Sequence, residues 1–117
     1  MDKKEFCVTK EYTIIEVMRV FERNKERGVV VVGEKGQVCG FVSMGDIIYA
    51  LIDGKNMYSH VGPICNSSVV YLKEKNYAKA LEIFQKRNIS LIPILNNDME
   101  LVDVITAREM FDMVELK

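Results

Sequence analysis

The chain has 117 residues, of which 49% are hydrophobic and 28% are charged, a balance typical of a globular domain with one hydrophobic core. Its formal net charge is −1, with acidic and basic residues interspersed, which argues against nucleic acid or an anionic membrane as a partner. No apolar run reaches the ~18 residues of a membrane span, so we expect a cytoplasmic protein.

The first half of the chain predicts a strand, a helix, two strands and a second helix. Residues 6–8 are β-prone, and Thr13 is a favourable N-cap for a helix whose apolar residues recur at Ile14, Val17, Met18 and Phe21. Residues 29–32 and 38–43 are strand-like segments on either side of a polar turn, which predicts a hairpin. A helix is expected at residues 46–52.

The second half repeats this pattern after a polar linker that contains Gly54, Gly62 and Pro63. Without gaps, the predicted strands, hairpin and helices recur at residues 69–71, 77–88, 91–95, 101–106 and 109–116, with Asn76 as the second N-cap. The sequence therefore predicts one repeat at residues 6–53, a linker at 54–67 and a second repeat at 68–116.

The two repeats should share one interior, because a chain of this length is too short for two independent cores. We expect an α/β fold with mixed sheets, in which two three-stranded sheets pack against each other with pseudo-twofold symmetry. The helices at residues 46–52 and 109–116 carry more apolar surface than one sheet can cover. We therefore predict a homodimer joined through these two helices.

A hydroxyl and an acid recur where each hairpin meets the next helix, as Ser43 with Asp46 and Thr106 with Glu109. This spacing is typical of a helix capping box, which is sufficient to explain both pairs. The same groups can also accept hydrogen bonds from a ribose diol, with backbone N–H groups of the helix start facing a phosphate. Gly40, just upstream, would let a ligand approach the backbone.

Together these features resemble a tandem pair of CBS domains, often called a Bateman module. The resemblance covers residues 6–116 and depends on the β-α-β-β-α repeat, on the sequence Gly40 to Asp46, on Ile92-Pro93-Ile94 and on Ile64-Cys65-Asn66. It implies a regulatory module that binds AMP, ADP, ATP or S-adenosylmethionine between the repeats and controls an attached or partner protein. It implies no catalysis and no cofactor besides that ligand.

The resemblance also implies roles for individual residues. In the first cleft, Asp46 would hold the ribose, Ser43 the ribose or phosphate, and Thr9, Val29 and Val30 would line the base pocket. In the second cleft the equivalent residues are Asp103, Thr106, Arg108 and Glu109. There Asp103 replaces the glycine of the motif and Glu109 is longer than the usual Asp, so we expect weaker binding, although Arg108 could offset the negative charge.

Two alternatives remain open. The chain could be a non-sensing dimerisation or interaction module, in which the hydroxyl and acid pairs only cap helices. It also resembles the regulatory CBS segment of sugar-phosphate nucleotidyltransferases over residues 59–106, although the transferase's glycine-rich loop is absent from this sequence. The dispersed cysteines Cys7, Cys39 and Cys65 and the single His60 predict neither a zinc site nor a disulfide framework.

Overall fold

The computed structural model describes residues 2–115, with side chains as far as Met113. Helix α2 begins two residues earlier than expected, and the predicted end of the last helix at residue 116 lies outside the described residues. In chain order the elements are η1 (Lys3–Glu5), β1 (Cys7–Val8), α1 (Ile14–Asn24), β2 (Gly28–Val32), β3 (Val38–Ser43), α2 (Met44–Ile52), α3 (Tyr77–Lys86), β4 (Leu91–Leu95), β5 (Leu101–Thr106) and α4 (Ala107–Glu115).

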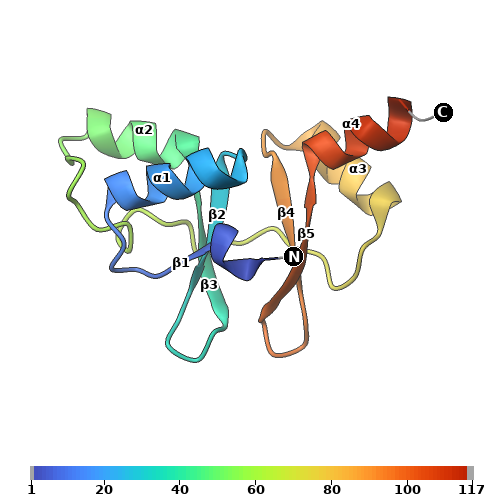
Figure 1. Cartoon of the computed structure of the whole chain (residues 1–117), viewed down its shortest axis with the longest axis horizontal. Helices are drawn as coiled ribbons and strands as arrows, with labels where there is room; N and C mark the ends of the chain where they lie inside the picture. The colour runs from blue at the N-terminus through green and yellow to red at the C-terminus, as the bar shows by residue number, and fades with distance from the viewer. Residues whose placement is uncertain (1, 116–117) are drawn as a thin grey trace.

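Two hairpins stand side by side at the centre of the molecule, and the helices of each repeat lie on the outer side of its own hairpin (Figure 1). In the first repeat, β1 pairs in parallel with β2, which pairs antiparallel with β3. In the second repeat, β4 and β5 form an antiparallel pair. Each hairpin has a register shift at the equivalent place, after Val31 and after Ile94. The predicted repeat is therefore present in the backbone.

The first strand of the second repeat is missing, and the expectation of a strand at residues 69–71 was wrong. Only an isolated bridge joins Leu72 to Ile94. In the first repeat, the N–H of Val30 donates to the carbonyl of Phe6 at 2.8 Å and so helps to hold β1. Pro93 occupies the position of Val30 and has no N–H to donate, so this hydrogen bond cannot form.

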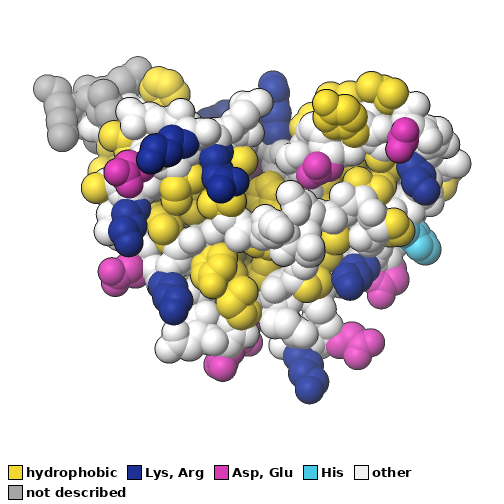
Figure 2. All heavy atoms as spheres, turned by 180° about the vertical axis from the view of Figure 1, so that it is seen from behind, with side chains coloured by type: hydrophobic (Ala, Val, Ile, Leu, Met, Phe, Trp, Pro, Cys, Tyr) yellow, Lys and Arg dark blue, Asp and Glu magenta, His cyan; other side chains and the backbone are white. Residues whose placement is uncertain are grey.

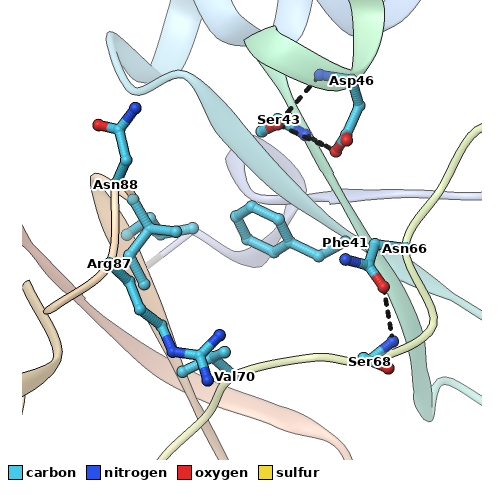
Figure 3. Close-up of a pocket in the computed structure, with 10 residues that line it drawn as sticks. Phe41, Ser43, Asp46, Asn66, Ser68, Val70, Arg87 and Asn88 are labelled. Atoms are coloured by element: carbon cyan, nitrogen blue, oxygen red, sulfur yellow. Dashed lines mark hydrogen bonds between the residues drawn. The ribbon is translucent and has the colours of Figure 1, made fainter.

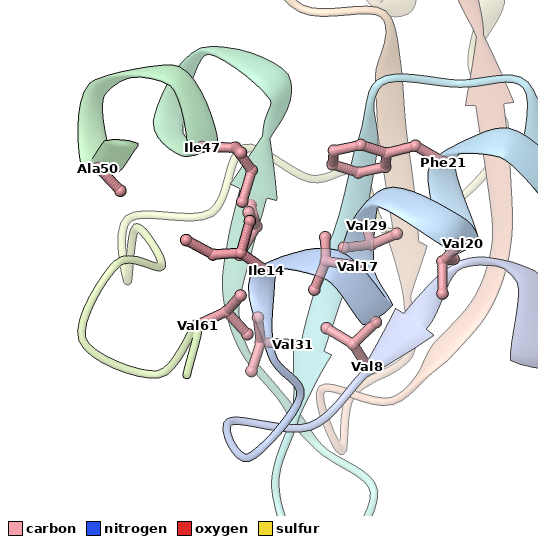
Figure 4. Packing of buried hydrophobic residues seen from close by; sticks show 11 residues of the cluster. Val8, Ile14, Val17, Val20, Phe21, Val29, Val31, Ile47, Ala50 and Val61 are labelled. Carbon is pink, nitrogen blue, oxygen red and sulfur yellow. The ribbon is translucent and has the colours of Figure 1, made fainter. Parts of the chain in front are cut away.

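Each repeat has its own buried cluster between its helices and its sheet. In the first repeat, Ile14, Val17 and Phe21 of α1 pack with Ile47 of α2 on one face of the sheet (Figure 4). In the second repeat a smaller cluster forms around Ala80, Ile92, Ile94 and Ile105. The amphipathic pattern read from the sequence thus places these helices on their sheets.

A third cluster joins the two repeats. Val30 and Val38 of the first hairpin pack with residues of the second hairpin, which are Leu91, Leu95, Leu101 and Val104. Next to this cluster, the N–H of Val38 donates to the carbonyl of Met99 at 2.7 Å. The expected common interior is therefore confirmed, because this buried cluster is made by both repeats.

Helices α2 and α4 keep large apolar side chains in contact with solvent. Ile48, Tyr49 and Ile52 of α2 are 51%, 78% and 76% exposed, and Phe111 of α4 is 71% exposed. Figure 2 shows hydrophobic side chains gathered at the end of the lobe that carries α2. None of the helices within residues 2–115 has the length and apolarity needed to cross a membrane.

Candidate functional site

Ser43 and Asp46 form a complete capping box at the start of α2. The backbone N–H of Ser43 donates to Asp46 Oδ2 at 2.8 Å, and its hydroxyl donates to the same oxygen at 3.0 Å. In return, the N–H of Asp46 donates to Ser43 Oγ at 3.2 Å. Both hydrogen bonds that the carboxylate accepts end on Oδ2, so within the described residues Asp46 Oδ1 has no donor and remains available to a ligand.

This pair lies in a groove between the two repeats, which we call the inter-repeat groove. Figure 3 shows Ser43 and Asp46 on one wall, Arg87 and Asn88 on the opposite wall, and Phe41 between them. The groove has a cavity volume of about 170 Å³ and is lined by Phe41, Ser43, Asp46, Asn66, Ser68, Val70, Arg87, Asn88, Ile89 and Leu91. This is below the ~300–1,000 Å³ of typical small-molecule sites, so a larger ligand would extend beyond these residues.

The linker closes one side of the inter-repeat groove. Asn66 pairs with Phe41 of β3 through two backbone hydrogen bonds, of 2.8 and 2.9 Å, so the linker runs beside the strand. The side chain of Asn66 accepts a hydrogen bond from the N–H of Ser68 at 2.9 Å through its carbonyl oxygen. The amide nitrogen of Asn66 makes no hydrogen bond among the described residues and is a further donor at the site.

Gly40 does not face the groove as a place of ligand approach. A Cβ at this position would lie 2.9 Å from Cys65 Sγ and 3.3 Å from Cys65 Cβ. The glycine therefore makes room for the linker against β3. The segment from Gly40 to Asp46 thus makes a packing contact at one end and a capping box at the other.

The three predicted base-pocket residues do not present side chains to the inter-repeat groove. Val29 and Val30 are fully buried, one in the core of the first repeat and the other in the shared cluster. Thr9 lines a separate depression beside Gln37 and Cys39, at the hairpin end of the sheet. The strand pairing places Val29 and Val30 beside Val42 and Phe41, next to Ser43, but their side chains are buried and do not line the inter-repeat groove.

In the second cleft, Thr106 and Glu109 form the equivalent capping box, but Glu109 also binds other side chains. The N–H of Glu109 donates to Thr106 Oγ1 at 3.0 Å, and the N–H of Thr106 donates to Glu109 Oε1 at 3.3 Å. The other carboxylate oxygen, Oε2, accepts from the Tyr77 hydroxyl at 3.0 Å and from Lys75 Nζ at 3.5 Å. Both oxygens of Glu109 are thus engaged inside the protein.

Asp103 strengthens this internal arrangement. Its Oδ2 lies 3.3 Å from Lys75 Nζ, so one ammonium group bridges Asp103 and Glu109. Partial burial lowers the pKa of Lys75, but the hydrogen bond with Asp103 and the charges of Glu109 and Asp103 outweigh this and leave the pKa raised. Lys75 therefore offsets part of the negative charge that we expected Arg108 to offset.

In the second cleft, the position equivalent to Arg87 holds a residue that is bound within the first repeat. Asn24 occupies the repeat position of Arg87 and donates to the carbonyl of Glu5 in η1 at 2.7 Å. Burial raises the pKa of Glu26, and the positive charge of Arg108 opposes this shift. In the second cleft, the amide of Asn24 therefore occupies the position at which the first cleft has the guanidinium of Arg87.

Sequence reasoning missed Arg87 and Asn88, which form the opposite wall. They follow α3 and precede β4, where the sequence shows only the end of a helix. The repeat offers no signal either, since the equivalent residues, Asn24 and Lys25, are of a different type. Only the packing of the two repeats places these residues opposite Asp46.

The comparisons with known proteins agree with this architecture. A family model described as "CBS domain" matches residues 1–53 and again residues 61–115, so it matches both repeats. A sequence search of curated proteins found no match.

Solved structures with the same fold contain CBS domains. A CBS domain protein from Pyrobaculum aerophilum, complexed with AMP, is 24% identical, with a TM-score of 0.77 over 95% of this chain and 89% of that chain. A protein from Methanocaldococcus jannaschii is 27% identical, with a TM-score of 0.79 over 97% of this chain and 47% of that one. A CBS domain pair in complex with 5′-methylthioadenosine and S-adenosyl-L-methionine is 18% identical, with a TM-score of 0.79 over 94% of this chain and 87% of that chain.

Proposed function

Because this chain belongs to the CBS domain family, we propose that it is a regulatory module that senses an adenosine nucleotide in the inter-repeat groove. The observation that carries the proposal is the free Oδ1 of Asp46, held half-buried by the capping box and facing Arg87 across an open groove. A carboxylate and a guanidinium on opposite walls match the two ends of a nucleotide. Diol hydrogens can donate to the first, and phosphate oxygens can accept from the second.

The remaining lining residues fit the same ligand. Phe41 and Val70 offer apolar contact to a purine ring, and the amide of Asn66 offers a donor at its edge. The exposed Arg87 makes no ion pair among the described residues, so a phosphate would not need to displace an existing partner. This assigns binding roles to the groove and no catalytic role.

The similar structures support an adenosine ligand in general terms. Their bound molecules are AMP in one case and 5′-methylthioadenosine with S-adenosyl-L-methionine in another, and all of these contain adenosine. In this chain, we expect the second cleft to be weak or inactive, because Lys75 and Tyr77 already bind Glu109.

Isothermal calorimetry with Asp46→Ala tests the proposal. Removing a carboxylate that accepts from the ribose should weaken binding of AMP, ADP or ATP by about 1.5–3 kcal/mol. Glu109→Ala is the matched control, since it removes the equivalent acid of the second repeat and should leave the affinity unchanged. Circular dichroism must show both variants folded, because each loses a helix cap. Equal affinity of Asp46→Ala and the parent protein would refute the assignment.

A second candidate function is assembly without sensing. The exposed apolar residues of α2 and α4 favour a homodimer formed through these helices, and the capping boxes would then serve only the helices. The two candidates are compatible, since a sensing module can also dimerise. They separate experimentally: the assembly-only function predicts no binding of any adenosine compound at millimolar concentration.

A further inference from the structure

The inter-repeat groove does not end at the capping box. A second chamber opens on its far side, around the start of α2, and shares Phe41, Ser43, Asn88 and Ile89 with the first. The residues that only the second chamber contacts are Arg27, Met44, Gly45, Ile48 and Ser90. A ligand that fills the first chamber can therefore extend past Ser43 without leaving the protein surface.

The second chamber is positively charged. Among residues 2–113, whose side chains the structure describes, Arg27 is the one charged residue that lines this chamber. The side chain of Arg27 makes no hydrogen bond or ion pair among the described residues, while its carbonyl accepts from the N–H of Met44 at 2.9 Å. The backbone of Arg27 is thus fixed beside the first turn of α2, and its guanidinium remains free for a ligand.

The start of α2 adds space and polarity on the same side. A Cβ built on Gly45 would meet only Ser43 Oγ, at 3.6 Å, so the backbone here is accessible. The first turn of a helix carries partial positive charge, which favours an anion over a cation. Arg27 and Arg87 therefore lie along one continuous groove, and Asp46 is the only acid among the described residues that line it.

We propose that the inter-repeat groove selects adenosine polyphosphates, ADP or ATP, over AMP and over S-adenosylmethionine, with Arg27 binding the terminal phosphates. This inference rests on the proposed function, since it needs the nucleoside in the first chamber. AMP has a single phosphate, which Arg87 can bind alone. S-adenosylmethionine carries a sulfonium, an ammonium and a carboxylate group, a net charge of +1, so the Arg27 guanidinium attracts it less than it attracts the polyanionic tail of ADP or ATP.

Calorimetry on the whole chain tests this selectivity, with AMP, ADP, ATP and S-adenosylmethionine titrated into the parent protein and into Arg27→Ala. The parent should bind ADP or ATP at least about 10-fold more tightly than AMP, as expected for an added charge-assisted contact. Arg27→Ala should lose about 10-fold or more in affinity for that polyphosphate and change less than about 2-fold for AMP. The fold should persist, because the backbone contact to Met44 remains.

Arg23→Ala serves as the matched control, since Arg23 is an exposed arginine in the last turn of α1 and lines neither chamber. It should leave all four affinities unchanged. If AMP binds in an Asp46-dependent manner as tightly as ATP, or if Arg27→Ala has no effect, the polyphosphate inference is overturned and the proposed function stands. If none of the four compounds binds, both fail.

Discussion

Replacing Leu95 by alanine should destabilise both repeats together, because Leu95 is fully buried in the cluster that they share. Truncation of a fully buried leucine removes its transfer free energy and leaves a cavity, which typically costs about 3–5 kcal/mol. The cavity would be bordered by Val30 and Val38 of the first repeat as well as by Leu101 of the second. For a domain of this size, a loss of about 3 kcal/mol lowers the Tm by roughly 10–15 °C.

Urea denaturation followed by circular dichroism gives the free energy of unfolding, and hydrogen exchange with mass spectrometry reports on each repeat. Leu95→Ala should reduce protection in α1 and β2 as much as in α3 and β5. Leu81→Ala is the control, because Leu81 is 46% exposed on α3 and its truncation should have a much smaller effect. Loss of protection confined to residues 77–106 would show that the repeats unfold separately and would refute the shared interior.

Three further predictions follow from individual contacts. Gly40→Ala should cost about 1–3 kcal/mol by overpacking against Cys65, and Cys65→Ala in the same chain should recover most of it, as a double-mutant cycle in urea would show. Lys75→Met should cost up to about 1 kcal/mol at pH 7. The pKa of Lys75 is raised above its ordinary value of 10.5 in the folded state. The ion pairs of Lys75 therefore contribute their full stability below pH 10.5 and lose it as the pH rises through the folded-state pKa. The melting temperatures of the parent and of Lys75→Met should therefore converge at alkaline pH. Light scattering should give a mass of twice 13.4 kDa for the parent and the monomer mass for Ile52→Asp; a monomeric parent would contradict the dimer.

Most of the fold could be predicted from the sequence because the strongest signals are local. Continuous apolar runs predicted β4 with its observed bounds, and Thr13 and Asn76 were correctly expected to cap helices. The strand expected at residues 69–71 failed for a reason that lies outside the segment. Its pairing depends on the N–H of the residue opposite, and that residue is Pro93.

The site was only half predictable. Ser43 and Asp46 are three residues apart at a helix start, so the sequence alone brings them together. Arg87 reaches the same groove from the other repeat, and no spacing in the chain indicates that contact. The side chains of Val29 and Val30 are buried in clusters on the two faces of β2, so the base-pocket role assigned to them remains a prediction that only their backbone could fulfil.

Backbone NMR of the labelled protein during titration with ADP tests the central claim most directly, because it locates the ligand as well as detecting it. Chemical-shift changes should be concentrated at Ser43, Asp46 and Arg87, and Thr106 and Glu109 should be little affected. Changes of equal size at Thr106 and Glu109, or no change at any residue at millimolar ADP, would contradict a sensing site at the inter-repeat groove.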